Sequence, residues 1–303
     1  MRPGEGAGSR PAEAAGARPK MLRAALALGA LACCARGAGP PQCDFKRLDG
    51  RKPVAAKIEK THRPLLITHG FPWREGMASR EAFLGHFGDH NITVVDDLNY
   101  QARKGIAGSS HQQTISQWAH SPPPAGNDTS KYFFGWLSMA DHYALSSAIL
   151  GQYDIPEALQ SWLTLDRFLV LGSRPEGSRT KGFALHNHLA SQVTLLAGEK
   201  LWFVFPPSAE PPVEPYKTHS EEVLADADGV QVCLQRASEI VVLPRRWWHA
   251  TLDRQSWTVG LGGQAGIPGG IELIEGKGDG RIAHLASVGS SAGLAGGPTR
   301  EGL

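Results

Sequence analysis

Two histidines one residue apart, followed much later in the chain by a third, constrain the fold more than any other feature. His186 and His188 stand in the segment F-A-L-H-N-H, and His249 ends the run P-R-R-W-W-H. Side chains alternate across an extended strand, so the first two histidines point to the same side if their segment is a strand. A returning strand that carries His249 beside them would bring three imidazoles together. A barrel of antiparallel strands provides this arrangement.

Short apolar runs bounded by glycine and proline predict a mostly β domain with peripheral helices. Strands are expected at 63–70, 92–96, 167–172, 183–188, 193–196, 201–205, 230–234, 240–243, 249–252 and 257–261. Helices are expected at 79–87, 154–163 and 218–225, from their capping residues, and a short helix is expected at about 114–119. We expect a hairpin around Gly198 and a loop at 101–113. The aromatic run 132–136 either lines the mouth of the barrel or belongs to its core.

The glycine-rich ends leave one domain between them. Residues 1–40 are expected to form a disordered leader with a signal peptide, 41–262 the barrel domain, and 263–303 a mostly disordered Gly/Ala-rich tail. The net charge of +2 over 303 residues gives no strong basic field, so no nucleic-acid partner is expected.

An apolar run at 24–34 follows basic residues and precedes small ones, which is typical of a secretory signal peptide. The run is shorter than the roughly 20 residues that span a membrane, so no transmembrane anchor is expected. The alternative is an alanine-rich leader that remains attached. The signal interpretation predicts a protein of the secretory pathway, in the endoplasmic reticulum lumen or secreted.

Three blocks, in order, resemble the JmjC (jumonji) domain of iron(II)- and 2-oxoglutarate-dependent oxygenases. That family carries His-x-Asp/Glu, a lysine in G-x-K-x-W-x-x-x-P-P, and a histidine after P-x-x-W-W-H. Here the blocks are H-N-H at 186–188, G-E-K-L-W-F-V-F-P-P around Lys200, and P-R-R-W-W-H ending at His249. The resemblance covers about 43–262 and implies a double-stranded β-helix, the jelly-roll or cupin-like JmjC barrel.

The resemblance implies that His186, His188 and His249 hold Fe(II). His188, however, stands where most members have Asp or Glu. Imidazole suits iron, zinc, copper and nickel alike, so another divalent metal, or none, remains open. His188 is either a ligand or a neighbour of the ligands. Taken singly, each histidine is as compatible with a core or surface role.

The resemblance also implies that Lys200 pairs with the distal carboxylate of 2-oxoglutarate, because a buried lysine needs an anion. The alternative is a solvated lysine at a turn. Many members have Thr or Ser where this chain has Phe183, which removes one expected co-substrate contact.

Once the segment with Cys33 and Cys34 is removed, Cys43 and Cys233 remain. An even pair suits a disulfide in an oxidising compartment, and both positions match cysteines in a member of the family. The alternative is two unrelated buried thiols. Asn91 and Asn127 lie in N-x-[ST] sequons and are candidate glycosylation sites.

Two functions follow from the resemblance. The first is a JmjC-fold protein with reduced or absent activity that binds or regulates a protein partner, favoured by His188 and Phe183. The second is an active 2-oxoglutarate-dependent hydroxylase of a protein substrate, favoured by the other two histidines and Lys200. Histone demethylation fits poorly, because a secretory leader directs the chain away from chromatin.

Overall fold

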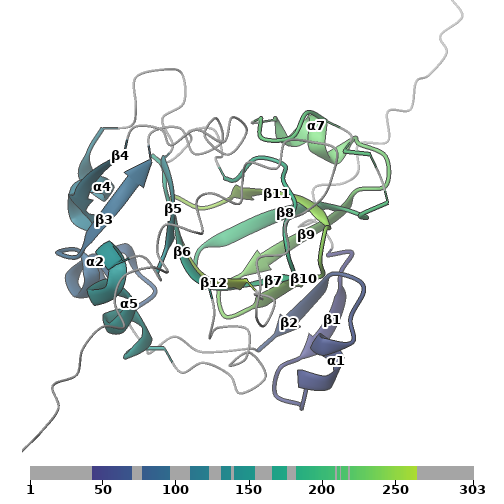
Figure 1. Cartoon of the computed structure of the whole chain (residues 1–303), viewed down its shortest axis with the longest axis horizontal. Coiled ribbons are helices and arrows are strands. Elements are labelled where there is room, and N and C mark those ends of the chain that lie inside the picture. Colours follow the sequence, from purple (N-terminus) through teal and green to yellow (C-terminus); the bar gives the residue numbers. More distant parts are fainter. Residues whose placement is uncertain are drawn as a thin grey trace, which may run out of the picture. The chain divides into compact units, whose positions relative to one another are not determined.

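The computed structural model describes residues 43–69, 77–95, 110–122, 131–137, 140–153, 166–175, 182–208, 210–211, 213–217 and 219–264 (Figure 1). The expected leader, the helix at 154–163 and Asn127 lie outside these ranges. So does the expected tail, except for residues 263 and 264, which complete the last strand. None of the helices in the described ranges has the length and apolar character needed to cross a membrane.

The larger sheet has seven strands in the order β1-β2-β10-β7-β12-β6-β5. Its strands are β1 (Lys46–Asp49), β2 (Leu65–Thr68), β10 (Ile240–Leu243), β7 (Ser191–Ala197), β12 (Trp257–Gln264), β6 (Asp166–Ser173) and β5 (Lys131–Trp136). All neighbouring pairs are antiparallel except β1 and β2, which are parallel.

A smaller sheet has the order β11-β8-β9, and a separate pair joins β3 to β4. These strands are β11 (Trp248–Asp253), β8 (Glu199–Phe205), β9 (Gln231–Arg236), β3 (Asn91–Val95) and β4 (Ser110–Thr114). The helices are α1 (Ala55–Glu59), α2 (Arg80–Phe87), α4 (Ile115–His120), α5 (Tyr143–Leu150), α7 (Glu221–Ala225) and the 3-10 turn η1 (Ala140–His142). This mostly β architecture confirms the predicted fold class.

From β7 to β12 the chain passes from one sheet to the other at every step except from β8 to β9, which pair within the smaller sheet, and this corrects one prediction. The strands on either side of Gly198 do not form a hairpin, because β7 pairs with β10 and β12 whereas β8 pairs with β11 and β9. Gly198 has φ +83°, and a Cβ there would lie 2.5 Å from the carbonyl oxygen of Trp257. Only glycine fits this crossing between sheets. The alternation is the winding of a double-stranded β-helix.

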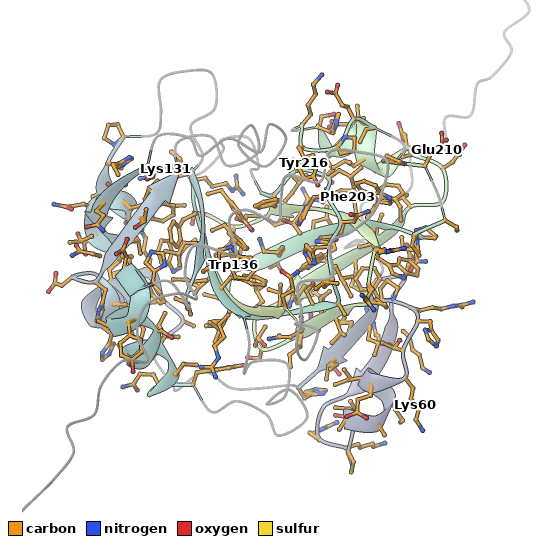
Figure 2. All side chains as sticks on the ribbon, in the orientation of Figure 1. Lys60, Lys131, Trp136, Phe203, Glu210 and Tyr216 are labelled. Atoms are coloured by element: carbon orange, nitrogen blue, oxygen red, sulfur yellow. A yellow bond between two sulfur atoms is a disulfide. The ribbon has the colours of Figure 1, made fainter. Side chains whose placement is uncertain are left out.

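Apolar side chains from both sheets fill the space between them (Figure 2). The shared cluster includes Val170, Val193, Trp202, Val204 and Val241. The outer face of the larger sheet is covered too, by a second cluster that contains side chains of α2, α4 and α5. For this reason all seven residues of β7 are buried.

Three further predictions were wrong in detail. Residues 183–188 form no regular strand but make one β-bridge with β11, between His186 and His249. Residues 110–113 of the expected loop, together with Thr114, form the strand β4. The helix α7 is capped by Ser220, whose hydroxyl accepts from Val223 N, two residues after the expected cap.

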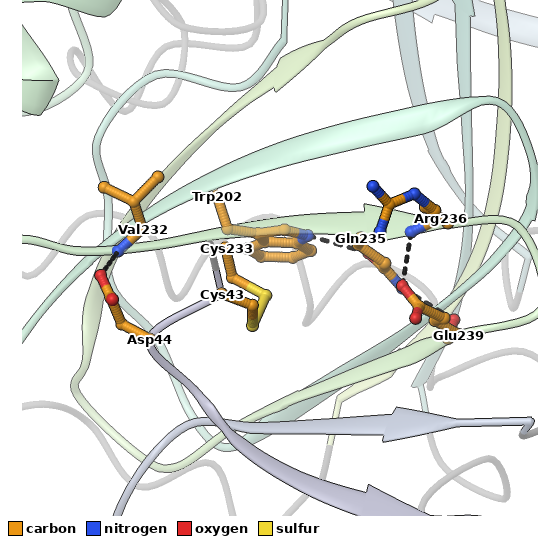
Figure 3. Close-up of a disulfide and its surroundings, with 8 residues drawn as sticks. All are labelled: Cys43, Asp44, Trp202, Val232, Cys233, Gln235, Arg236 and Glu239. Atoms are coloured by element: carbon orange, nitrogen blue, oxygen red, sulfur yellow. Dashed lines mark hydrogen bonds between the residues drawn. A yellow bond between two sulfur atoms is a disulfide. The ribbon is translucent and has the colours of Figure 1, made fainter. Parts of the chain in front are cut away.

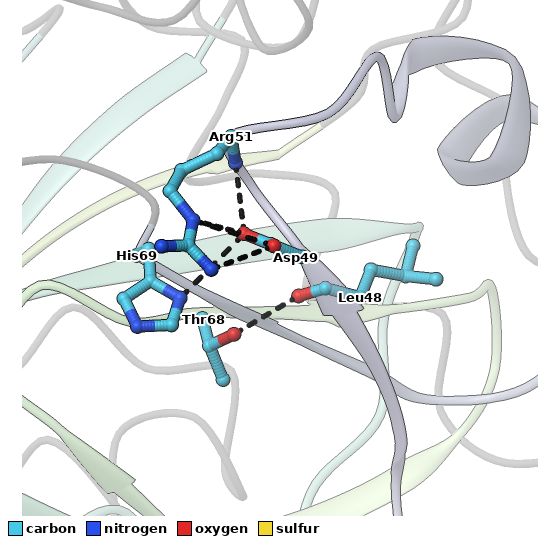
Figure 4. Close-up of polar contacts among 5 residues, drawn as sticks. All are labelled: Leu48, Asp49, Arg51, Thr68 and His69. Atoms are coloured by element: carbon cyan, nitrogen blue, oxygen red, sulfur yellow. Dashed lines mark hydrogen bonds and ion pairs between the residues drawn. The ribbon is translucent and has the colours of Figure 1, made fainter.

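The start of the domain is attached to both sheets. Cys43 and Cys233 form the predicted disulfide (Figure 3). Asp44 N donates to Val232 O of β9, and the Asp44 carboxylate accepts from Val232 N at 2.8 Å. The chain then enters β1, where Asp49 accepts hydrogen bonds from Arg51 (Figure 4). The Arg51 guanidinium holds the pKa of Asp49 well below its usual value.

Replacing both Cys43 and Cys233 by serine should lower the free energy of unfolding by about 2–5 kcal/mol, because the bond closes a long loop in the unfolded chain. Urea denaturation of the variant and of the wild type, each with and without reductant, measures this. Reductant should destabilise only the wild type. Equal midpoints for all four samples would show that the bridge contributes nothing.

Candidate metal centre

Segment 183–188 runs along the free edge of β11. His186 N donates to His249 O at 3.0 Å, and His249 N donates to His186 O at 2.8 Å. The segment is held at both ends: Thr251 N donates to Phe183 O at 3.0 Å and Arg246 N to His188 O at 2.8 Å. These bonds hold the two sequence-distant histidine motifs side by side.

The three predicted histidines form one cluster. Each offers a ligand nitrogen, and these atoms lie within 4.8 Å of one another. The ring centroids are 5.1 Å apart for His186 and His188, 4.1 Å for His186 and His249, and 4.7 Å for His188 and His249. Such a set can hold a divalent metal ion, although it contains no carboxylate.

Backbone carbonyls determine which nitrogen of each ring is available. Nδ1 lies 2.8 Å from Ala184 O in His186, 2.6 Å from Leu189 O in His188, and 2.9 Å from Trp247 O in His249. A carbonyl oxygen only accepts, so each Nδ1 carries the proton and each Nε2 keeps its lone pair. Metal-binding histidines are commonly oriented in this way. The donor set therefore fits a metal.

Burial keeps all three rings neutral. It lowers the pKa of His186 to about 3, with a smaller effect from nearby His188. Burial also lowers the pKa of His188, and it lowers that of His249 well below the usual value, with His186 and His188 adding to the effect. Protons then compete little with a metal at neutral pH.

Lys200 lies inside the sandwich and already has an anion. The ammonium is 2.5 Å from Asp253 Oδ1, and the two side chains are 2% and 4% exposed. Although burial opposes its charge, Asp253 raises the pKa of Lys200 above the usual value. The alternative of a solvated lysine is wrong, because Lys200 is buried. The anion that a buried lysine requires is supplied by Asp253 of the same chain.

The register of β8 and β11 places this pair in the same interior as the histidines. Cross-strand partners are His249 with Val204, Thr251 with Trp202, and Asp253 with Lys200. Alternate residues share a face, so His249, Thr251 and Asp253 all point inward. The sequence analysis did not identify Asp253 as a site residue. Its spacing of four from His249, however, indicates that both side chains lie on the same face of one strand.

Tyr132 of β5 closes the other side. Lys200 Nζ lies 5.1 Å from the centre of its ring. Burial raises the pKa of the Tyr132 phenol above its usual value, and the nearby positive charge of Lys200 opposes this rise. Together these groups surround the place where the family resemblance puts the distal carboxylate of 2-oxoglutarate. With Lys200 neutralised by Asp253, the residues present do not fit that co-substrate.

Aromatic rings of β5 and of segment 183–188 are in contact with one another and with the histidine cluster. Residues of β5 alternate, with Phe133 in the outer core and Phe134 half-buried against Phe183 at 5.6 Å between centroids. The Phe183 ring in turn lies 4.4 Å from that of His186. Phe133 thus belongs to the outer core, and Tyr132, Phe134 and Trp136 pack half-buried against the inner core, which agrees with the core interpretation of the run 132–136.

The flanking predictions can also be compared with the structure. Trp247 is buried between the sheets, and the sequon residue Asn91 is exposed at the start of β3.

The two packed sheets and the histidine cluster at the edge of β11 are consistent with a cupin-like JmjC β-sandwich that carries a candidate metal site. Sequence comparison agrees: the chain is a distant homologue of JmjC domain-containing protein 8. It is 29% identical to the human protein over 191 residues, which cover 58% of this chain and 66% of that protein. The rat protein is 30% identical over 190 residues and the mouse protein 28% over 196, each covering 58% of this chain and 64% of the relative.

The match thus spans less than two thirds of the length of these relatives. No protein-family model matches the chain.

Zinc or ferrous iron should bind to the metal-free protein at one ion per chain, and His249→Ala should weaken binding on the order of 100-fold or more, because one of three donors is lost. Isothermal titration with each metal measures the affinity. His86→Ala, an exposed histidine of α2, is the matched control and should bind normally. Equal affinity for His249→Ala and wild type would place the metal elsewhere.

Acid should destabilise the metal-free protein. His186 has a lowered pKa of about 3 when folded against 6.5 in the reference state. Between these values the unfolded chain binds the extra proton, so this histidine's stabilisation is complete above pH 6.5 and is lost as the pH falls toward 3. His186 alone should cost about 1–2 kcal/mol at pH 5. His186→Asn should flatten the dependence measured by denaturation at pH 7 and pH 5, and an unchanged slope would contradict the assignment.

Proposed function

We propose that the protein is a JmjC-type metal-binding protein of the secretory pathway that does not turn over 2-oxoglutarate and acts by binding a protein partner. The observation that carries the proposal is the buried ion pair of Lys200 and Asp253. The cation that would receive the co-substrate is already neutralised inside the fold. A second carboxylate brought to the same lysine would meet like charge in a poorly solvated place.

Two further features support loss of turnover. The site offers three imidazoles, and no Asp or Glu takes the place of His188. The side chain at 183 is a phenyl ring, which has no hydrogen-bonding group for a co-substrate.

The secretory location is supported by the apolar run at 24–34 and by the disulfide between Cys43 and Cys233, since such bonds persist in oxidising compartments. The sequon residue Asn91 is exposed, as glycosylation requires.

The alternative is an active protein hydroxylase. It is favoured by the neutral Nε2 donors of His186 and His249, which suit a catalytic iron as well as a structural metal.

Purified protein supplied with ferrous iron and 2-oxoglutarate labelled at C1 should release no labelled carbon dioxide above a metal-free control. His188→Asp supplies the missing carboxylate and should also stay inactive, because it leaves Lys200 paired. Turnover by the wild type would establish the hydroxylase instead. Turnover by His188→Asp alone would show that the ligand, and not the ion pair, prevents the reaction.

A further inference from the structure

A second group of polar side chains lies on the outer face of the larger sheet, which α2 and α4 cover (Figure 1). Trp257, the first residue of β12, packs edge-on against Phe83 of α2, with 5.7 Å between the ring centres. Arg80, the first residue of α2, has its guanidinium carbon 5.9 Å from the centre of the Trp257 ring. The residues of this outer cluster differ from those that fill the space between the sheets beside His249. The group is therefore separate from the candidate metal centre.

Two cations converge on the end of α4. The Lys131 ammonium donates to three backbone carbonyl oxygens there, those of Trp118, Ala119 and Ser121. Arg80 Nη2 donates to Ala119 O as well, at 3.1 Å. Burial and, to a smaller extent, the positive charge of Arg80 lower the pKa of Lys131 to about 8. Among the described residues, no carboxylate balances these two charges.

Two N–H groups of the same cluster are free to donate. Arg80 Nε and Trp257 Nε1 are buried, and neither has a hydrogen-bond partner in the described part of the chain. Leaving a buried donor unpaired costs its full desolvation free energy, so native proteins rarely do so. The three protons of the Lys131 ammonium, in contrast, are all used by carbonyl oxygens. Arg80 and Trp257 thus present donors to a ligand, and Lys131 adds only its charge.

These features define the chemistry of the ligand. It has to accept hydrogen bonds, because the free groups are N–H donors, and it has to carry negative charge, because two cations lie there without a carboxylate. A doubly charged oxyanion meets both requirements, since several of its oxygens accept at once and its charge matches the two cations. The donor atoms are shielded from solvent, which favours a small ion, while the Arg80 side chain is only partly buried.

We propose that Arg80 and Trp257 bind a small doubly charged oxyanion, inorganic phosphate or sulfate. Arg80 Nε and Trp257 Nε1 donate to two of its oxygens, and Lys131 stabilises its charge from the end of α4. The bound ion links α2 to the first residue of β12, and it compensates the repulsion between Arg80 and Lys131. Binding there needs neither the histidines nor 2-oxoglutarate, so the inference goes beyond the proposed function.

The indole N–H of Trp257 reports directly on the bound ion. In the NMR spectrum of isotope-labelled protein, its resonance is the indole signal that Trp257→Phe lacks. Titrating the wild type with millimolar sodium sulfate or phosphate at constant ionic strength should move this signal in a saturable way. The indole signal of Trp202, which already donates to Gln235, should stay in place. Acetate and chloride, which carry a single charge, should have a much smaller effect.

Thermal unfolding with the same salts measures what each group contributes, because an ion that binds only the folded state raises the melting temperature with its concentration. Arg80→Gln should weaken binding by about tenfold or more, since a charge-assisted hydrogen bond is lost. Trp257→Phe keeps a ring against Phe83 but removes the N–H, so it should weaken binding less. The matched control is Arg47→Gln, at an exposed arginine of β1, which should bind as the wild type does.

Sulfate and phosphate also stabilise proteins without occupying a site, because they are excluded from protein surfaces. This general effect would raise the wild type, Arg80→Gln and Arg47→Gln equally and would not saturate, and that result would overturn the inference. So would a Trp257 signal that neither oxyanion moves, or one that acetate moves as strongly as sulfate. If Arg80→Gln does not fold, the wild-type titration and Trp257→Phe still decide the outcome.

Discussion

The antiparallel register between β11 and β8 is the constraint on which the interior depends. It sets His249 opposite Val204 and Asp253 opposite Lys200, and it turns all four side chains toward the larger sheet. A shift of one residue would move every one of them to the opposite face. Both the histidine cluster and the ion pair are thus consequences of one pairing.

Two kinds of ionisable group therefore share the mostly apolar interior, and they tolerate burial for different reasons. The histidines remain neutral, and each has its Nδ1 proton bound by a carbonyl oxygen. Lys200 stays charged, and its cost is offset by an opposite charge at hydrogen-bonding distance. A neutral donor set suits a cation from solution, whereas a compensated cation offers little to an incoming anion. The histidine nitrogens are thus available to a metal ion, whereas the charge of Lys200 is already balanced by Asp253.

Much of this was accessible from the sequence, because local patterns carry it. Alternating apolar runs located most strands, and the H-N-H and W-W-H motifs identified the residues that converge. The pairing of Lys200 with Asp253 was missed, because Asp253 belongs to no motif; only its spacing of four from His249 indicates that both lie on one face of their strand. The pairing around Gly198 was also predicted wrongly. A glycine between two strands usually indicates a hairpin, and only the packing of whole sheets decides that the chain crosses instead.

The attachment of the first described residues has a mechanical consequence. Cys43 is bonded to β9 of the smaller sheet, while the chain a few residues later enters β1 of the larger one. Tension applied through anything joined ahead of Cys43 would thus be borne by a covalent link to β9 before it reached the hydrogen bonds of β1. Reducing that link would transfer the load to a short edge strand, which could then peel away one bond at a time.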